Sequence, residues 1–281
     1  MNTTIYLQGG LGNQLFQFSA ALLLARNKKI DQLRISPELL SQSHEMFKRE
    51  FSIQPLLEEH EITKSSFPKA LFVKPFHFLK ILDFEDSRGN SVDIYLQPWT
   101  RHIVGYFQNS VMTDSIWESL RTRLFKTPPF SLLLEPPSET YVAVHVRLGD
   151  YLQVSSAEQT HGTCSMQYYI NGIAKATEVS KCQYVKVVSD DIDATRTMFS
   201  ESTVLADYSF DFIDGNTEVE DLAVLSQARS VVMSNSTFSW WGAYIAHKER
   251  NALIIYPSPW FNTDKIQPQE LFCDDWFSIE R

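Results

Sequence analysis

The stretch from Tyr141 to Tyr151 combines a strand pattern with residues that can bind a negative charge. It reads YVAVHVRLGDY, and its first half alternates β-branched residues as a buried strand does. His145 and Arg147 share one face, because the side chains of a strand repeat every second residue. Burying a guanidinium there is unfavourable unless an anion meets it. The pattern therefore predicts an anion beside Arg147.

A phosphate is the anion that suits Arg147 best. The planar guanidinium can donate two parallel hydrogen bonds and keeps its charge near neutral pH. Gly149 allows a sharp turn at the carboxyl end of the strand, where open α/β sheets bind ligands, and Asp150 is then carried into the same crevice. The alternative is a structural ion pair between arginine and aspartate that closes the strand.

A second strand, 184–188, ends in Ser189, Asp190 and Asp191 and leads into a helix. One aspartate is expected to cap that helix, as aspartates do well. The other is left to accept the N–H groups of a guanine base, because an ionised carboxylate is a pure acceptor. A metal site that holds a diphosphate is the alternative for the pair.

A third strand, 230–233, opens into a turn of small polar residues at the start of a helix. Hydroxyls and backbone N–H groups at a helix amino end can cradle a phosphate, whereas the alternative is an ordinary N-cap followed by a core helix rich in tryptophan. The residues expected to contact the ligand are Ser234, Asn235, Ser236, Thr237 and Phe238.

The amino-terminal strand, 5–8, runs directly into the glycine-rich turn GGLGNQ. Gly12 allows close approach of the backbone, and Asn13 places an amide at the helix start, where N–H groups are free and the dipole is positive. A dinucleotide fingerprint is excluded because Leu15 occupies the place of its third small residue. A close-packed βα unit with capping amides is the alternative to a ligand site.

Residues 28–100 show no clear pattern and are assigned to a variable face. After the strand-like 101–104, the side chains of Tyr106, Phe107 and Gln108 could line a sugar site by stacking and hydrogen bonding, or belong to the core.

Composition is that of a folded protein, with 43% hydrophobic and 13% aromatic residues. A net charge of −9 without basic runs argues against nucleic acid as a partner. The three separated cysteines predict neither a disulfide framework nor a zinc site, and they favour a reducing compartment. Since neither a signal peptide nor a membrane-spanning stretch is predicted, we expect a cytoplasmic protein, with peripheral membrane contact left open.

The second half reads as alternating strands and helices, with an additional short strand expected at 204–205. Three successive strand ends carry ligand-type residues, and these ends meet at one edge of a right-handed parallel sheet. The predicted fold class is α/β, with two Rossmann-like domains facing a central cleft. The proline-rich segment 126–140 marks the boundary. We assign 1–138 to an acceptor-side domain, 139–262 to a nucleotide-binding domain, and 263–281 to a segment that folds back on the first.

The motifs GGLGNQLFQ, HVRLGDY, VVSDD and SNSTFSWWGA, in this order, resemble the four motifs of the α-1,2-fucosyltransferase family. The similarity extends from Gly9 to Trp260. It implies a GT-B architecture, GDP-β-L-fucose as donor substrate with no separate cofactor, and a galactose-terminated glycan as acceptor, as in the synthesis of bacterial surface glycans such as O-antigen. It also implies that Arg147 contacts the donor diphosphate and that the turns 189–191 and 234–238 contact the nucleotide.

One position departs from the family pattern, since Leu148 stands where relatives have a second arginine. Neighbouring strand residues point to opposite faces, so Leu148 should face away from Arg147 and leave donor binding intact.

An inverting transfer needs a base for the acceptor hydroxyl, and Asp150 is the first candidate. His145, which the nearby Arg147 should keep neutral, Glu158 and His161 are the others. No metal is expected. The alternatives are a metal-dependent glycosyltransferase that uses Asp190 and Asp191, and a nucleotide-sugar or glycan-binding protein without turnover.

Overall fold

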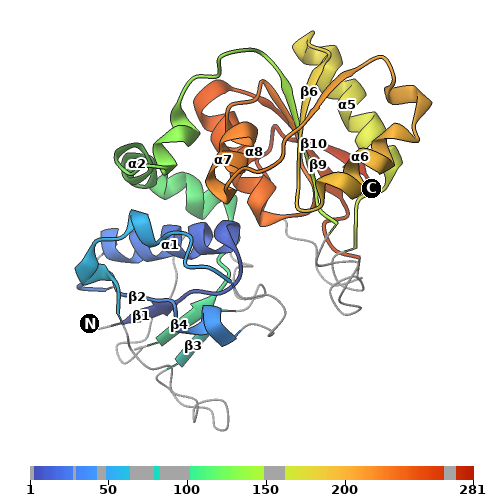
Figure 1. The fold of residues 1–281 in the computed structure, drawn as a ribbon. Helices are drawn as coiled ribbons and strands as arrows, with labels where there is room; N and C mark the ends of the chain where they lie inside the picture. The colour runs from blue at the N-terminus through green and yellow to red at the C-terminus, as the bar shows by residue number, and fades with distance from the viewer. Residues whose placement is uncertain are drawn as a thin grey trace. The chain divides into compact units, whose positions relative to one another are not determined.

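A computed structural model describes residues 3–27, 30–42, 49–63, 79–82, 102–148, 162–262 and 270–281. By its internal contacts the chain divides into two compact units. The first contains residues 1–127 and 270–272, and the second contains 128–269 and 273–281. The division falls inside the proline-rich segment 126–140. Figure 1 shows a sheet with its own helices in each unit.

The first unit is built on a parallel four-stranded sheet in the order β2-β1-β4-β3. Helix α1 (Leu11–Arg26) is buried around most of its circumference and packs against α2 (Ser110–Lys126). This burial explains why its sequence is apolar on every side instead of along one stripe. The strands are β1 (Thr4–Tyr6), β2 (Ile35–Ser36), β3 (Leu79–Leu82) and β4 (His102–Gly105), and the 3-10 helices are η1 (Glu38–Gln42), η2 (Gln54–Leu56) and η3 (Glu59–Glu61).

The second unit contains a parallel six-stranded sheet in the order β10-β9-β8-β5-β6-β7. Counted along the chain from β5, this is the strand order 3-2-1-4-5-6 of the Rossmann fold, with the order reversing between β5 and β8. The strands are β5 (Val142–Val146), β6 (Tyr184–Ser189), β7 (Ser209–Phe212), β8 (Ser230–Val232), β9 (Leu253–Ser258) and β10 (Phe277–Glu280).

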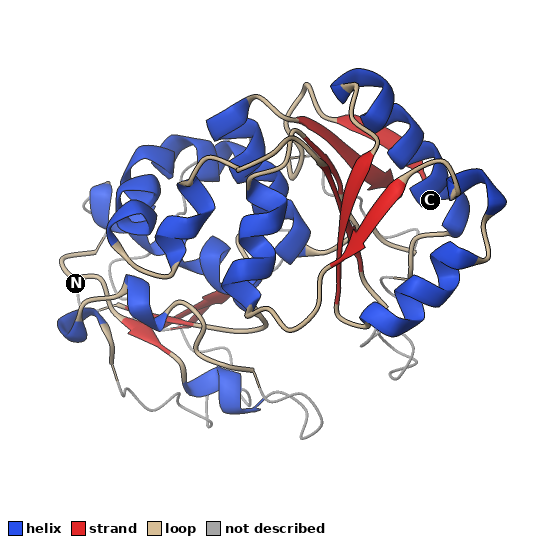
Figure 2. Ribbon diagram, turned by 45° about the horizontal axis from the view of Figure 1, so that its top comes forward, coloured by secondary structure: helices blue, strands red, loops and turns tan. Residues whose placement is uncertain are grey.

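Helices cover both faces of this sheet. Figures 1 and 2 show α5 (Met166–Ser180) and α6 (Ile192–Ser200) on one face, and α7 (Glu218–Ser226) and α8 (Thr237–Arg250) on the other. Each of α5, α6, α7 and α8 has an N-cap residue whose side chain accepts a hydrogen bond from a backbone N–H of the first turn. The described part of this unit also contains the 3-10 helices η6 (Phe130–Leu134) and η7 (Thr203–Leu205).

The core between the sheet and α5 takes every second residue of β5, namely Val142, Val144 and Val146. Leu148 continues this row and packs against the same core. The prediction that Leu148 faces away from Arg147 is therefore confirmed. Its apolar side chain thus extends the core between the sheet and α5 beyond the end of β5.

The predicted α/β class is confirmed, since both sheets are parallel and carry helices. The prediction of a short strand at 204–205 was wrong, because these residues belong to η7. The edge strand β7 follows at Ser209–Phe212. Of the carboxyl-terminal segment, 270–272 group with the first unit, whereas 273–281 group with the second and include β10. None of the helices in the described ranges is long and apolar enough to cross a bilayer.

Candidate functional site at the carboxyl edge of the second sheet

The carboxyl end of β5 lies at the point where the strand order of the second sheet reverses. Strand β5 pairs with β6 on one side and with β8 on the other. The chain runs from β5 through α5 to β6 and reaches β8 only later, so the strand order reverses between β5 and β8, and open α/β sheets bind their ligands at such a point. The register aligns Val146 with Ser189 and Val144 with Val232. The predicted convergence of the three motifs at one sheet edge is confirmed.

Arg147 pairs with an aspartate, as in the alternative of a structural ion pair, and its contact with a phosphate stays a prediction. Its Nε lies 3.1 Å from Oδ2 of Asp190, and the backbone N–H of Leu148 donates to Oδ1 of Asp190 at 2.8 Å. The carboxylate of Asp190 therefore holds the end of β5, and its contact with a guanine base stays a prediction. About a fifth of each side chain is exposed, 22% for Arg147 and 24% for Asp190. The ion pair thus fixes the guanidinium at the rim of the sheet, not inside the core.

Asp191 caps α6, as one of the two aspartates was expected to do. Its Oδ1 accepts a hydrogen bond from the N–H of Ala194 at 3.0 Å. Ser189 Oγ accepts from the N–H of Asp191 at 3.1 Å and from the hydroxyl of Thr195 at 2.8 Å. The turn that follows β6 is therefore held by its own side chains, and Asp190 and Asp191 serve different partners.

His145 ties β5 to the turn that follows β8. Its Nδ1 lies 2.7 Å from the hydroxyl oxygen of Ser234, and its ring lies 5.4 Å from that of Phe238 between centroids. Burial lowers the pKa of His145 to about 3, and the positive charge of Arg147 contributes to this lowering. The predicted direction is confirmed, although burial is the larger cause. A neutral, buried imidazole of such low basicity positions the turn and is a poor acceptor for a proton from a substrate.

The turn that opens α8 is stabilised by its own serines. Ser236 caps the helix by accepting a hydrogen bond from the N–H of Phe238 at 3.3 Å. Ser239 donates from its hydroxyl to the carbonyl of Ser234 at 2.9 Å. Thr237 and Phe238 are partly exposed, whereas Ser234 is fully buried. The part of this segment that reaches solvent is therefore the first turn of α8.

Asn235 holds two chain segments together instead of pointing outward. Its side chain is buried, and Nδ2 donates to the carbonyls of Gly162 at 3.1 Å and Trp260 at 3.4 Å. The thiol of Cys164 lies 3.7 Å from its Oδ1. Burial raises the pKa of this thiol to about 11, so Cys164 is a protonated core residue at neutral pH. In this structure Asn235 acts as an internal tie between loops.

The candidates for the general base lie mostly outside the described residues. The segment 149–161 falls in one of the gaps between the described ranges. It contains the candidates Asp150, Glu158 and His161, and also Gly149. The assignment of Asp150 as first candidate therefore stays a prediction.

The glycine-rich turn of the first unit lies at the start of α1. Gly9 has φ +74°, and a Cβ there would lie 2.3 Å from Nδ2 of Asn13, so only glycine fits. Asn13 accepts a hydrogen bond from the side chain of Gln108 at 3.0 Å, and Gly12 is buried. Sequence reasoning overlooked Arg49, which lies beside this turn, because its segment carries no periodic pattern.

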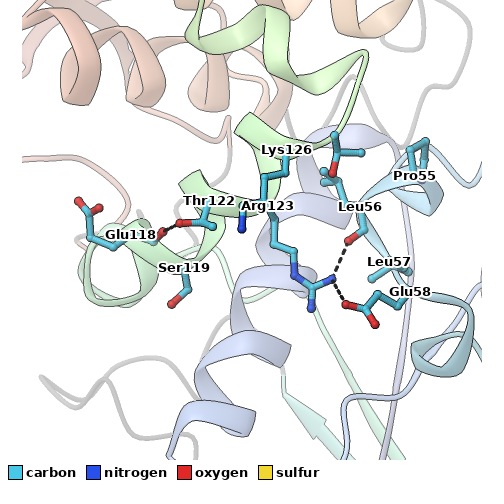
Figure 3. Close-up of a pocket in the computed structure, with 10 residues that line it drawn as sticks. Pro55, Leu56, Leu57, Glu58, Glu118, Ser119, Thr122, Arg123 and Lys126 are labelled. Carbon is cyan, nitrogen blue, oxygen red and sulfur yellow. Dashed lines mark hydrogen bonds and ion pairs between the residues drawn. The ribbon is translucent and has the colours of Figure 1, made fainter.

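A shallow depression of about 710 Å³ lies elsewhere in the first unit, between α2 and the segment 55–58 (Figure 3). On one side it is lined by the last turns of α2, which lie away from the carboxyl edge of the sheet. Arg123 lies in it, but its guanidinium donates to both carboxylate oxygens of the buried Glu61, at 3.1 and 2.7 Å, and to the carbonyl of Leu56 at 3.2 Å. These contacts give Arg123 a structural role, and the depression is not the candidate site.

Comparison with known proteins gives a consistent result. A model of glycosyl transferase family 11 matches residues 1–280. The chain is 29% identical over 297 residues to an alpha-1,2-colitosyltransferase of Escherichia coli, with 98% of each chain covered. It is 26% identical over 324 residues to the O-antigen biosynthesis glycosyltransferase WbnK of Escherichia coli, with 97% of this chain and 99% of the other covered. A galactoside alpha-(1,2)-fucosyltransferase 2 of Sus scrofa is 31% identical over 146 residues, which cover 50% of this chain and 42% of that protein.

The buried His145 should make stability depend on pH. Its folded-state pKa, about 3, lies below the ordinary value of 6.5, so between these values the unfolded chain binds a proton that the folded chain does not. Stability should therefore fall as the pH falls, with a contribution from His145 of about 2 kcal/mol between pH 7 and 5. Chemical denaturation of the wild type and His145→Gln at both pH values measures this difference.

His60→Gln serves as the matched control, since the side chain of His60 is 70% exposed. Equal pH dependence in the wild type and His145→Gln would show that His145 is not held in its neutral form.

Proposed function

Because the chain belongs to glycosyl transferase family 11, we propose that it transfers L-fucose from GDP-β-L-fucose to the 2-hydroxyl of a terminal galactoside, forming an α-1,2 linkage with inversion. The observation that supports this most is the position of Arg147. It ends the central strand of a Rossmann-type sheet, at the reversal of strand order, and the amino end of α8 belongs to the turn beside it.

The proposed chemistry follows from where charge develops. When GDP leaves C1 of fucose, negative charge grows on the β-phosphate and positive charge on the sugar ring. A guanidinium and backbone N–H donors that are already in place stabilise that distribution more than they stabilise the bound donor. Asp190 fixes the direction of Arg147, and His145 fixes the turn that presents the first N–H groups of α8. These two contacts keep the groups that would receive the diphosphate in position before it arrives.

The acceptor hydroxyl would attack C1 from the face opposite the departing GDP. A carboxylate is the natural base for this step, and Asp150 follows Arg147 closely in the chain. We assign it that role as part of the proposal. His145 is reassigned from candidate base to positioning residue, because its pKa of about 3 leaves it little basicity.

Colitose is the second candidate for the transferred sugar, because the colitosyltransferase relative matches 98% of the chain. Colitose is fucose without its 3-hydroxyl, so the same phosphate-binding groups serve both donors. Discrimination then depends on a single hydroxyl. The similarity to WbnK supports a place for the reaction in the assembly of O-antigen or a related surface glycan.

The first test is an assay of transfer. Purified chain, incubated with GDP-fucose or GDP-colitose and a panel of β-galactosides, should release GDP and yield a product glycosylated at O2 of galactose, with GDP-fucose the better donor. Affinity for the nucleotide sugar without product would identify a binding protein instead. A preference for GDP-colitose would select the second candidate.

Transfer should persist in EDTA. Asp191 accepts the capping N–H of α6 and Asp190 accepts from Arg147 and Leu148, so both carboxylates already have positively polarised partners. Loss of transfer in EDTA, with recovery on adding Mn²⁺ or Mg²⁺, would favour the metal-dependent alternative built on Asp190 and Asp191.

Arg147→Ala should lower kcat/KM by about 10²-fold or more, because it removes a main donor to the developing negative charge. Steady-state kinetics with varied donor measure the loss. Arg229→Ala is the matched control, since Arg229 is an exposed arginine of the same unit whose guanidinium donates to the backbone carbonyls of Arg250 and Asn251.

The double variant Arg147→Ala with Asp190→Ala separates catalysis from stability. If the ion pair is only structural, removing both partners should restore turnover that the single variant lost. If Arg147 acts on the donor, the double variant should stay as slow as Arg147→Ala.

A further inference from the structure

The first unit has its own reversal of strand order, between β1 and β4. These strands are paired, with Tyr6 opposite Val104, while β1 also pairs with β2 on its other side. The chain leaves β1 toward β2 and reaches β4 only later, and the loops that follow β1 and β4 lie side by side at the carboxyl edge, where Gln108 donates to Asn13. These loops are the turn at Gly9 and Gly10 and the segment 106–109.

Amide side chains of α1 fix the segment 106–109 on both sides. Gln17 donates to the carbonyl of Gly105 at 3.0 Å while its Oε1 accepts the N–H of Gln8 at 3.0 Å. Asn13 accepts from Gln108 at 3.0 Å. Residues 106 and 107 lie between these two ties. The loop is therefore held in one conformation by the helix that starts beside it.

Phe107 has a strained backbone conformation, and its neighbour Tyr106 is exposed. Phe107 has φ +54°, a left-handed conformation that is unfavourable for a residue with a bulky side chain. In this conformation its ring packs inward against Ala20, Leu23 and Met112. Tyr106 stays outside with 41% of its surface exposed. An exposed aromatic next to a strained residue is typical of a binding loop rather than of a packing defect.

Arg49 reaches the same place from a distant part of the chain. Gln14 donates to the carbonyls of Glu50 at 2.8 Å and Gly9 at 3.0 Å, so it holds the residue next to Arg49 against the glycine turn. Nη1 of Arg49 lies 4.0 Å from the point where a Cβ on Gly10 would stand. Arg49 at Gly10 and the segment of Tyr106, tied through Gln108 to Asn13, therefore both lie beside the glycine turn.

We propose that Tyr106 and Arg49 form the subsite for a pyranose ring of the acceptor glycan, an inference that rests on the proposed function. The aromatic face of Tyr106 covers the C–H face of the sugar, and the guanidinium of Arg49 donates hydrogen bonds to its hydroxyls. An aromatic ring beside a fixed donor suits a neutral polyol. The diphosphate of the donor, by contrast, is assigned to Arg147 and α8 in the second unit.

Tyr106→Ala and Arg49→Gln should each raise the KM for a β-galactoside acceptor such as lactose about tenfold or more. The KM for GDP-fucose, and the slow release of GDP in the absence of acceptor, should stay within about twofold of the wild type. Tyr106→Phe keeps the aromatic face and should retain an acceptor KM close to that of the wild type. Phe125→Ala is the matched control, because Phe125 is 64% exposed on α2 of the same unit.

The outcomes separate this subsite from the proposed function. An unchanged acceptor KM in both variants overturns the subsite, and an equal rise in donor KM assigns these residues to the donor instead and also overturns it. If the wild type transfers neither fucose nor colitose, the proposed function fails. Saturation-transfer NMR of lactose with the wild type, Tyr106→Phe and Tyr106→Ala then tests the subsite. The subsite requires that the wild type and Tyr106→Phe bind lactose and that Tyr106→Ala does not.

Discussion

The ion pair between Arg147 and Asp190 determines the arrangement of the site in the second unit. One carboxylate accepts from the guanidinium Nε and from the N–H of Leu148, so it joins the turn after β6 to the end of β5. Because the pair lies at the rim of the sheet, with about a fifth of each side chain exposed, it gives the guanidinium one direction. On the other side of β5, His145 joins the strand to the turn after β8 through Ser234. The end of the central strand is thus tied to both neighbours.

The two units solve the same problem with different chemistry. Each has a parallel sheet whose strand order reverses, and in each the described segments at that point are held by side chains from nearby elements. The second unit uses a charged pair and a buried imidazole. The first uses the amides of α1, chiefly Gln14 and Gln17, which bridge segments far apart in the sequence. Amides suit a buried position because they satisfy both donors and acceptors without charge. This explains why the GGLGNQLFQ motif combines glycines with amides.

Much of the second unit could be predicted, because its signals are local. Alternation in β5 identified the buried strand, the position of Leu148 followed from the two-residue repeat, and a cap from one of the two aspartates, found to be Asp191, was expected. What could not be predicted depends on contacts between distant residues. Nothing near Asp190 in the sequence shows that Arg147 reaches it, and nothing near Asn235 shows that Gly162 and Trp260 lie beside it. The edge strand β7 was missed because its residues are only partly buried. Arg49 lies in a segment without periodicity, where only the folded chain reveals its neighbours.

The carboxylate beside Arg147 also affects product release under the proposed function. A guanidinium without a counter-ion would bind the diphosphate strongly both in the donor substrate and in the GDP that is left after transfer. Asp190 neutralises much of that field at short range. The attraction of the guanidinium for the diphosphate, whose negative charge is greatest after transfer, is therefore weaker than that of an arginine without this carboxylate. Under the proposed function, the carboxylate of Asp190 thus favours dissociation of GDP after transfer.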